Sequence, residues 1–203
     1  MTLEAVPLTL PARSAAEPVG AFVGVVGPSG AGKDSIINAA RARFAGNPKV
    51  VFARREITRA ADGNEPHGSL SHEAFQRGIA QDDFALWWRA NGLCYALPSE
   101  LHQDMAAGRI VVANLSRDCV TKAREAFARC VIVHVTARAD ILADRLSQRA
   151  REGATEQAGR IRRSELLDQS VGADLTIENS GAIERAADQF ARIIAAILGR
   201  AAA

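Results

Sequence analysis

The sequence predicts an α/β fold in which a parallel β-sheet is covered by helices on both faces. Short apolar runs alternate with longer helical patterns along the chain. The runs are nearly continuous in Val and Ile and do not alternate with polar residues, which is typical of strands buried on both faces of a parallel sheet. Parallel neighbours need helical, right-handed crossovers, and the alternation of the two patterns supplies them.

Five apolar runs are the expected strands, and together they predict a five-stranded sheet. They lie at residues 21–26, 50–53, 110–113, 131–135 and 175–177. Helices are expected over residues 33–44, 98–107, 117–128, 140–151 and 160–167. A last helix follows from Ile183, with apolar residues at helical spacing, Ser180 as its cap and Gly199 as its end. Residues 56–92 are less regular and are interpreted as an insertion over the edge of the sheet.

Size, charge and cysteine content limit the classes of function. The 203 residues suffice for one domain, expected over residues 20–203 after a loose tail at 1–19. A net charge of only +2 makes neither nucleic acid nor a membrane an expected partner. Three cysteines without Cys-x-x-Cys spacing, and an N-terminus interrupted by prolines, predict a cytoplasmic protein without disulfides. The sequence does not indicate an oligomeric state.

The four histidines show no spacing that is typical of a metal site. They are interpreted as surface or structural residues, and they are His67, His72, His102 and His134.

A phosphate-binding loop follows the first expected strand. It comprises Gly27, Pro28, Ser29, Gly30, Ala31, Gly32, Lys33, Asp34 and Ser35. The Gly-x-x-x-x-Gly-Lys spacing between a strand and a helix is that of a P-loop, whose backbone N–H groups surround phosphate at a helix N-terminus. The lysine of such a loop contacts the β- and γ-phosphates. The chain is therefore expected to bind a nucleoside triphosphate.

Asp34 departs from the general P-loop pattern, in which a Ser or Thr follows the lysine and binds Mg²⁺. A carboxylate is a stronger magnesium ligand than a hydroxyl. The strand at 110–113 ends at Asn114, at a position where many P-loop enzymes have a metal-binding aspartate. Two interpretations remain open: Asp34 is a relocated Mg²⁺ ligand, or it only caps the helix.

The P-loop resembles that of guanylate kinases, within the nucleoside monophosphate kinase fold. Ile57-Thr58-Arg59 is similar to the start of their acceptor-binding segment, and Tyr95 to its far end. The resemblance implies an acceptor-binding insertion at about 55–95 and an arginine-bearing lid at about 145–162. The pattern that reads guanylate is incomplete, because Asp62 stands where those kinases have a second arginine and no tyrosine precedes Tyr95.

Four motifs resemble those of the ribose 1,5-bisphosphate phosphokinases, the guanylate-kinase-like enzymes of phosphonate utilisation. They are Gly32-Lys33-Asp34-Ser35, Ile57-Thr58-Arg59, the block from Phe84 to Tyr95, and Asn114-Leu115-Ser116-Arg117. This resemblance implies transfer of the ATP γ-phosphoryl group to the 1-phosphate of ribose 1,5-bisphosphate, giving 5-phosphoribosyl 1-diphosphate and ADP, with Mg²⁺. A guanylate or other nucleoside monophosphate kinase is the alternative. A non-catalytic binding module is a third interpretation, which the intact P-loop disfavours.

Such a reaction needs cations and no general base, because the acceptor phosphate is already ionised at neutral pH. The residues expected to act on the transferring phosphoryl group are Lys33, Arg145 and Arg149. The two arginines are four residues apart, on one face of a helix next to the implied lid. The residues expected to bind the acceptor are Arg55, Arg59, Tyr95 and Arg117.

Overall fold

The structure, a computed structural model, describes residues 20–59, 67–151 and 172–201, without the side chains of residues 149–151, 200 and 201. The expected tail, the expected helix at 160–167 and most of the expected lid lie outside these residues.

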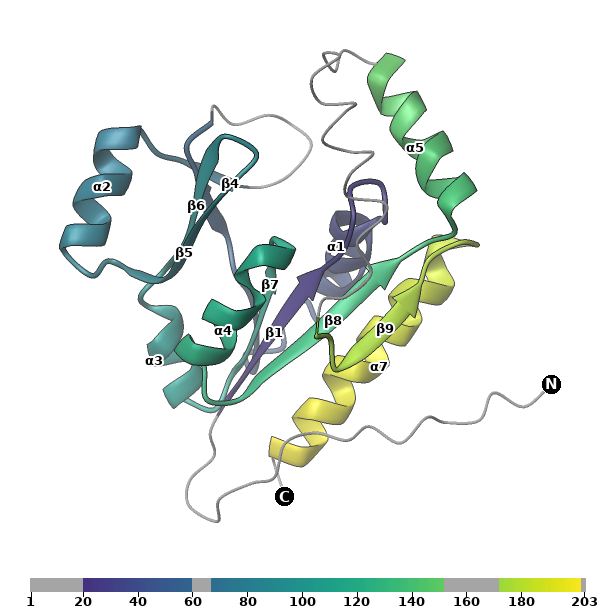
Figure 1. Cartoon of the computed structure of the whole chain (residues 1–203). Coiled ribbons are helices and arrows are strands. Elements are labelled where there is room, and N and C mark those ends of the chain that lie inside the picture. The colour runs from purple at the N-terminus through teal and green to yellow at the C-terminus, as the bar shows by residue number, and fades with distance from the viewer. Residues whose placement is uncertain (1–19, 60–66, 152–171, 202–203) are drawn as a thin grey trace.

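The centre of the fold is a five-stranded sheet in the order β2-β7-β1-β8-β9, with every neighbouring pair parallel. Its strands are β1 (Ala21–Val26), β2 (Val50–Phe52), β7 (Ile110–Asn114), β8 (Cys130–Thr136) and β9 (Leu175–Glu178). The α/β fold and all five expected strands are confirmed. Because β1 is central, the loop that follows it lies in the middle of the carboxyl edge of the sheet (Figure 1).

Helices cover both faces of this sheet (Figure 1). On one face lie α1 (Lys33–Arg43) and α7 (Ile183–Ala201), which pack on Val23 and Val25 of β1. On the other lie α3 (Leu101–Ala106), the 3₁₀ turn η1 (Arg117–Cys119) and α4 (Val120–Ala126), which pack on Phe22 and Val26. Alternate side chains of β1 thus enter two cores, which explains its continuous apolar sequence. Helix α5 (Ala139–Arg151) follows β8 at the carboxyl edge.

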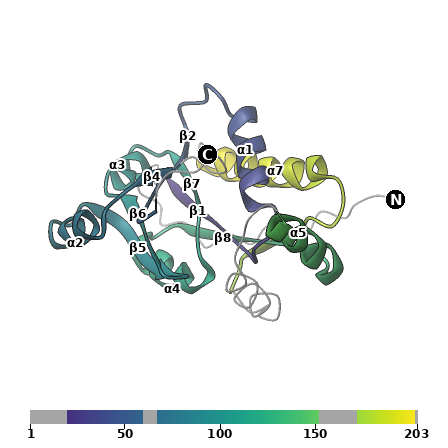
Figure 2. The same cartoon turned by 90° about the horizontal axis from the view of Figure 1, so that it is seen from above.

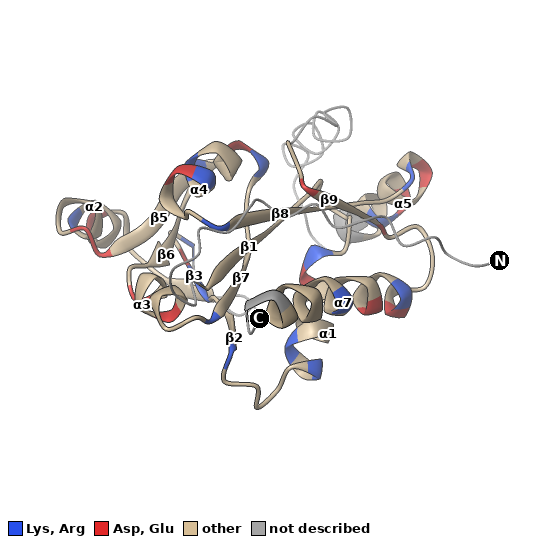
Figure 3. Cartoon of the chain, turned by 90° about the horizontal axis from the view of Figure 1, so that it is seen from below, with Lys and Arg blue, Asp and Glu red and all other residues tan. Residues whose placement is uncertain are grey.

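Acidic and basic residues occur together on α4, α5 and α7 (Figure 3). Within residues 20–59, 67–151 and 172–201, no helix combines the length and the apolar character needed to cross a membrane.

A second sheet corrects the interpretation of residues 56–92 as irregular. It has four strands in the order β4-β3-β6-β5, and it lies with α2 to one side of the main sheet (Figure 2). Its elements are β3 (Arg55–Ile57), β4 (His67–Ser69), α2 (His72–Ala80), β5 (Phe84–Ala90) and β6 (Leu93–Pro98). Asn91 (φ 51°) and Gly92 (φ 74°) join β5 to β6. Two positive φ angles are typical of a type I′ hairpin turn, for which Asn-Gly is the preferred sequence.

Two expected helices have different bounds. The helix expected at 98–107 begins only at Leu101, because Pro98 pairs with Phe84 in the second sheet. The helix expected at 117–128 is a 3₁₀ turn followed by α4, and it ends before Phe127. Phe127 instead stacks on Phe22, with ring centroids 4.1 Å apart. In both places, packing against a sheet determines where the helix can run.

The last helix begins at Ile183 as expected, but its expected cap and its expected end are wrong. Gly199 lies inside α7, which continues to Ala201. The helix begins at Ile183, and the hydroxyl of Ser180 instead accepts the backbone N–H of Arg138 (2.8 Å) and donates to Glu178 (2.9 Å). Ser180 therefore connects the loop before α7 to the segment that enters α5.

All three cysteines are free and buried. Burial is the main cause that raises the pKa of Cys119 to about 12 and that of Cys130 to about 11, so both stay protonated thiols at neutral pH.

Replacing the core residue Phe190 tests the packing of α7 on the main sheet. Its side chain is fully buried among the strands and α1. We expect Phe190→Ala to lower the free energy of unfolding by about 3–5 kcal/mol, because it leaves a cavity in a closely packed core. Urea denaturation measures the loss, with Gln189→Ala on the exposed face of α7 as the control. Equal midpoints for the two variants would contradict this packing.

Candidate active site

Three glycines with positive φ shape the P-loop, at Gly27 (147°), Gly30 (83°) and Gly32 (88°). A Cβ atom at Gly27 would overlap the carbonyl oxygen of Val135 in β8, and one at Gly32 would overlap the side-chain amide of Asn179. The loop therefore passes too close to two neighbouring segments for any larger residue. This contact holds the loop against the carboxyl edge of the sheet.

Lys33 is the first residue of α1, and its ammonium group lies over the loop. Its Nζ donates hydrogen bonds to the carbonyl oxygens of Gly27 (2.7 Å) and Pro28 (3.0 Å). The N–H of Ile36 donates to Gly32 O (3.0 Å), as the first turn of α1 requires. Amides that precede the first helical bond point out of the end of a helix, so loop and helix together form a cradle for an anion.

Asp34 lies in the first turn of α1, beside the end of β7. Gly32 is the N-cap of the helix and no side chain caps it, so the interpretation of Asp34 as the cap is wrong. Instead, Nδ2 of Asn114 donates a hydrogen bond to Oδ1 of Asp34 (2.6 Å). A carboxylate can only accept, which fixes the orientation of the amide. Oδ1 of Asn114 is then buried and has no hydrogen-bond partner among the described residues.

Asn179 supports the P-loop from the segment after β9, a role the sequence did not indicate. Its side chain is 2% exposed, and its Nδ2 donates to the carbonyl oxygen of Ala31 (2.8 Å). Its own backbone N–H donates to Thr136 O at the end of β8 (2.7 Å). The amide thus connects the loop to the main sheet.

Arg145 reaches the P-loop from α5. Its Nη1 donates to the carbonyl oxygen of Gly30 (3.2 Å). Arg149 is one turn further along α5, and its side chain lies outside the described part of the chain. The structure therefore brings Lys33, Asp34 and Arg145 to one loop.

A stack of side chains forms the inner face of the second sheet. The guanidinium of Arg55, 9% exposed, lies 5.5 Å from the ring centroid of Tyr95. The Tyr95 ring is stacked on Trp88, with centroids 5.3 Å apart and 7° between the planes. Because β6 lies between β3 and β5, Arg55 and Trp88 contact opposite sides of the Tyr95 ring. Trp88 then donates from Nε1 to the hydroxyl of Ser116 (2.8 Å).

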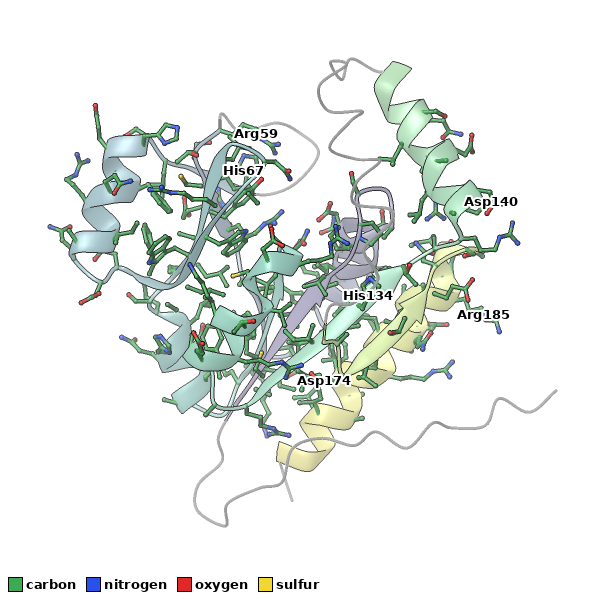
Figure 4. All side chains as sticks on the ribbon, viewed as in Figure 1. Arg59, His67, His134, Asp140, Asp174 and Arg185 are labelled. Atoms are coloured by element: carbon green, nitrogen blue, oxygen red, sulfur yellow. The ribbon has the colours of Figure 1, made fainter. Side chains whose placement is uncertain are left out.

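The stack joins the second sheet to the turn after β7, because Ser116 directly precedes Arg117. Arg117 begins η1 at the carboxyl edge of the main sheet. Arg59 lies further out, exposed near the end of β3, at the same end of the molecule as the P-loop (Figure 4). Trp87 points to the other face of the second sheet, where it contacts Phe75 and Lys122.

Comparison with known proteins gives relatives over most of the chain. No protein-family model matches the chain. It is 48% identical over 174 residues to the "Ribose 1,5-bisphosphate phosphokinase PhnN" of a Chelativorans species, covering 84% of this chain and 83% of that protein. It is 44% identical over 175 residues to the protein of the same name from Bradyrhizobium diazoefficiens, covering 86% and 88%.

Among solved structures, the guanylate kinase from Anaplasma phagocytophilum matches with a TM-score of 0.62 and 20% identity, over 88% of this chain and 86% of that one. At that identity the likeness bears on the fold alone, and it confirms the nucleoside monophosphate kinase type.

Replacing Asn179 tests whether this amide holds the loop in shape. Asn179→Ala leaves the Ala31 carbonyl without its partner, and we expect a loss of about 1–3 kcal/mol in the free energy of unfolding. Binding of a non-hydrolysable ATP analogue, measured by calorimetry, should weaken as well, because the anion cradle loses its fixed geometry. Thr176→Ala, on the exposed side of β9, is the control. Unchanged nucleotide affinity in a folded Asn179→Ala variant would remove this role.

Proposed function

This chain belongs to the ribose 1,5-bisphosphate phosphokinase family, and on that premise we propose that it transfers the γ-phosphoryl group of ATP to the 1-phosphate of ribose 1,5-bisphosphate, giving 5-phosphoribosyl 1-diphosphate and ADP. The observation that carries the proposal is 44–48% identity to proteins of that name over more than four-fifths of each chain. We also propose phosphonate catabolism as its setting and the cytoplasm as its compartment, where buried free thiols persist.

The arrangement of cations supports this reaction. An oxygen of the acceptor phosphate attacks the γ-phosphorus, and the bond from that phosphorus to the β,γ-bridging oxygen breaks. Lys33 and Arg145 lie at the P-loop, where charge develops on the donor, and Arg117 lies at the neighbouring strand end. Positioned cations lower the barrier by neutralising charge that both substrates bring together. Since the acceptor is already an anion, no side chain has to remove a proton.

The contact between Asp34 and Asn114 fits a magnesium ion. Mg²⁺ prefers hard oxygen ligands and is commonly held by one or two carboxylates together with substrate phosphates. Asp34 offers a carboxylate next to the anion cradle, and the buried Oδ1 of Asn114 is an unused amide oxygen beside it. The described residues contain no cluster of three or more His, Cys, Asp or Glu, so nucleotide phosphates would complete the coordination. Mg²⁺ supplies charge neutralisation of the triphosphate.

The Arg55–Tyr95–Trp88 stack favours an acceptor substrate that has no nucleobase. A guanylate acceptor presents a purine that a kinase can hold between ring faces. Both sides of the Tyr95 ring are occupied, one by Trp88 and the other by Arg55. The ring can therefore offer only its hydroxyl edge to a ligand, beside a guanidinium. A hydroxyl and a cation suit a sugar phosphate better than a nucleobase.

Parallel assays of ADP formation with ribose 1,5-bisphosphate and with GMP test the proposal. We expect turnover with the sugar bisphosphate, a ³¹P spectrum that shows a diphosphate at position 1, and little turnover with GMP. Lys33→Ala, which removes the cation of the P-loop, is the control and should lose on the order of 10²-fold or more in kcat. Faster turnover with GMP would establish the alternative, a nucleoside monophosphate kinase.

Removing one cation that is expected to bind the acceptor should change the KM for only one of the two substrates. We expect Arg117→Ala or Arg59→Ala to raise the KM for ribose 1,5-bisphosphate while the KM for ATP stays nearly unchanged. A charge-assisted contact contributes about 1.5–3 kcal/mol, which corresponds to roughly tenfold to a hundredfold in affinity. Arg192→Ala, exposed on α7, is the control. A selective rise in the KM for ATP would place the residue in the donor site instead.

A magnesium titration tests the role of Asp34. Asp34→Ser restores the common P-loop residue but removes the carboxylate, so half-maximal rate should need more Mg²⁺. Binding of ATP without metal should stay level or improve, because repulsion between carboxylate and phosphate is gone. Asn114→Asp in the Asp34→Ser background restores an acid at the end of β7 and should recover the metal response. A titration equal to that of the wild type in Asp34→Ser would exclude a metal-binding role.

A further inference from the structure

His134 lies in β8 at the carboxyl edge of the main sheet, below the P-loop (Figure 4). It pairs with Val26, which directly precedes the P-loop, and with Thr176 of β9. Residues two apart in a strand share a face, so His134 points to the same side as Ile132. That side packs on α4 and on Leu86 and Trp88 of the second sheet. The imidazole thus belongs to the side of the sheet from which the acceptor is expected to enter.

The imidazole is buried without a complete set of hydrogen bonds. His134 is 8% exposed, and its Nε2 is buried with no hydrogen-bond partner among the described residues. An unpartnered polar atom in the interior is costly, and such atoms are rare in native proteins. A ligand that enters the site and accepts a hydrogen bond from Nε2 would remove this cost.

The charges around His134 indicate what kind of ligand this is. Burial, followed by the positive charges of Arg117 and Lys33, lowers the pKa of His134, so the ring is neutral at pH 7. Three carboxylates on neighbouring elements have other partners. Asp34 accepts from Asn114, and Asp174 accepts from Arg124 and from the N–H of Ile132. Glu178, on the same side of β9 as Asp174, accepts from the hydroxyl of Ser180. An imidazole that shares its surroundings with two cations is placed to contact an anion, not a metal ion or another cation.

We propose that His134 is a phosphate-binding residue of this site, donating its Nε2 hydrogen to an oxygen of the acceptor phosphate. The assignment rests on the proposed function, which supplies an acceptor phosphate between Lys33 and Arg117. It differs from the interpretation of the histidines as surface or structural residues. Arg117 and His134 then bind the acceptor from the turn after β7 and from β8, the two strands that flank β1, and the acceptor phosphate faces the nucleotide at the P-loop.

Proton linkage follows from this placement. An anion next to the ring favours its protonated form, so binding of the acceptor raises the pKa of His134. Affinity for the acceptor should therefore increase as the pH falls from the pKa of the complex towards the lower pKa of the empty site. The acceptor phosphate itself loses charge in acid, which acts in the opposite direction. A variant without the imidazole isolates the contribution of His134.

Histidine NMR on the wild-type protein tests the proposal without relying on a folded variant. With ¹⁵N-labelled histidine, and with His134→Gln to assign the signal, the pKa of each ring is followed in the presence of ADP. We expect ribose 1,5-bisphosphate to raise the pKa of His134 and to leave exposed His72 on α2 unchanged. No shift at His134, while calorimetry shows the sugar bisphosphate bound, overturns the proposal.

Kinetics of two variants distinguish binding from packing. His134→Leu removes the donor, and the KM for the acceptor should rise by roughly tenfold to a hundredfold, with the KM for ATP unchanged. His134→Gln keeps an N–H donor that does not titrate. It should therefore bind the acceptor more tightly than His134→Leu does, but without the part of the pH dependence that comes from the imidazole. A purely structural residue would change stability in both variants without this split between substrates, and that result overturns the proposal.

A separate probe keeps this test distinct from that of the proposed function. If calorimetry shows that ribose 1,5-bisphosphate does not bind, the proposed function fails. The pKa of His134 is then followed with ADP and inorganic pyrophosphate, an anion that needs no sugar subsite. A raised pKa supports His134 as a phosphate ligand of the site, and an unchanged one overturns it.

Discussion

The close approach of the P-loop to the backbone of β8 is the constraint on which the rest of the site depends. Gly27 passes against the Val135 carbonyl, and Gly32 passes against the Asn179 amide, so the loop has one position relative to the sheet. That position determines where α1 begins, and therefore where Lys33 and Asp34 project. Because Asn179 is connected to the end of β8 by its own N–H, the same strand holds the loop on two sides.

A second constraint joins the two sheets. The hydrogen bond from Trp88 to Ser116 connects the hairpin of the second sheet to the turn between β7 and η1. Trp88 also stacks on Tyr95, which in turn contacts Arg55. Ser116 directly precedes Arg117 in the chain. Movement of the second sheet would therefore displace all of these side chains together. Residues that we propose to bind the acceptor, from separate parts of the chain, are thus connected by these contacts. Such pre-organisation is what a reaction between two anions needs.

The main sheet, the P-loop and the family could all be predicted from the sequence. Nearly continuous apolar strands and an intact loop motif are local signals, and both are confirmed. It also pointed to Asp34 and Asn114 as related departures from the usual pattern, and the structure brings them into contact. The second sheet was missed because β3 and β4 have three residues each and pair with distant segments. One usable signal, Asn91-Gly92 between two apolar runs, was present.

Two further differences between the sequence analysis and the structure concern the contacts of single side chains, which the sequence alone does not show. Ser180 has the right residue type for a helix cap, yet its hydroxyl binds the segment that enters α5. His134 stands in a strand that reads as core, and only the fold shows that its Nε2 is unpartnered beside two cations. Tertiary contacts override local preference in both cases. For His134, the buried nitrogen without a hydrogen-bond partner is the observation from which we infer a ligand.

The hydrogen bonds of the loop also order the two cations that we propose to bind phosphate. Lys33 donates to the carbonyls of Gly27 and Pro28, and Arg145 donates to the carbonyl of Gly30. These carbonyl oxygens hold each cation over the cradle. A neutral carbonyl oxygen, however, is a weaker hydrogen-bond partner for a cation than an ionised phosphate oxygen. On the proposed function, we expect an arriving phosphate to replace these weaker bonds with stronger ones at nearly the same positions. The side chains are already ordered, so less of the binding energy is lost in fixing them.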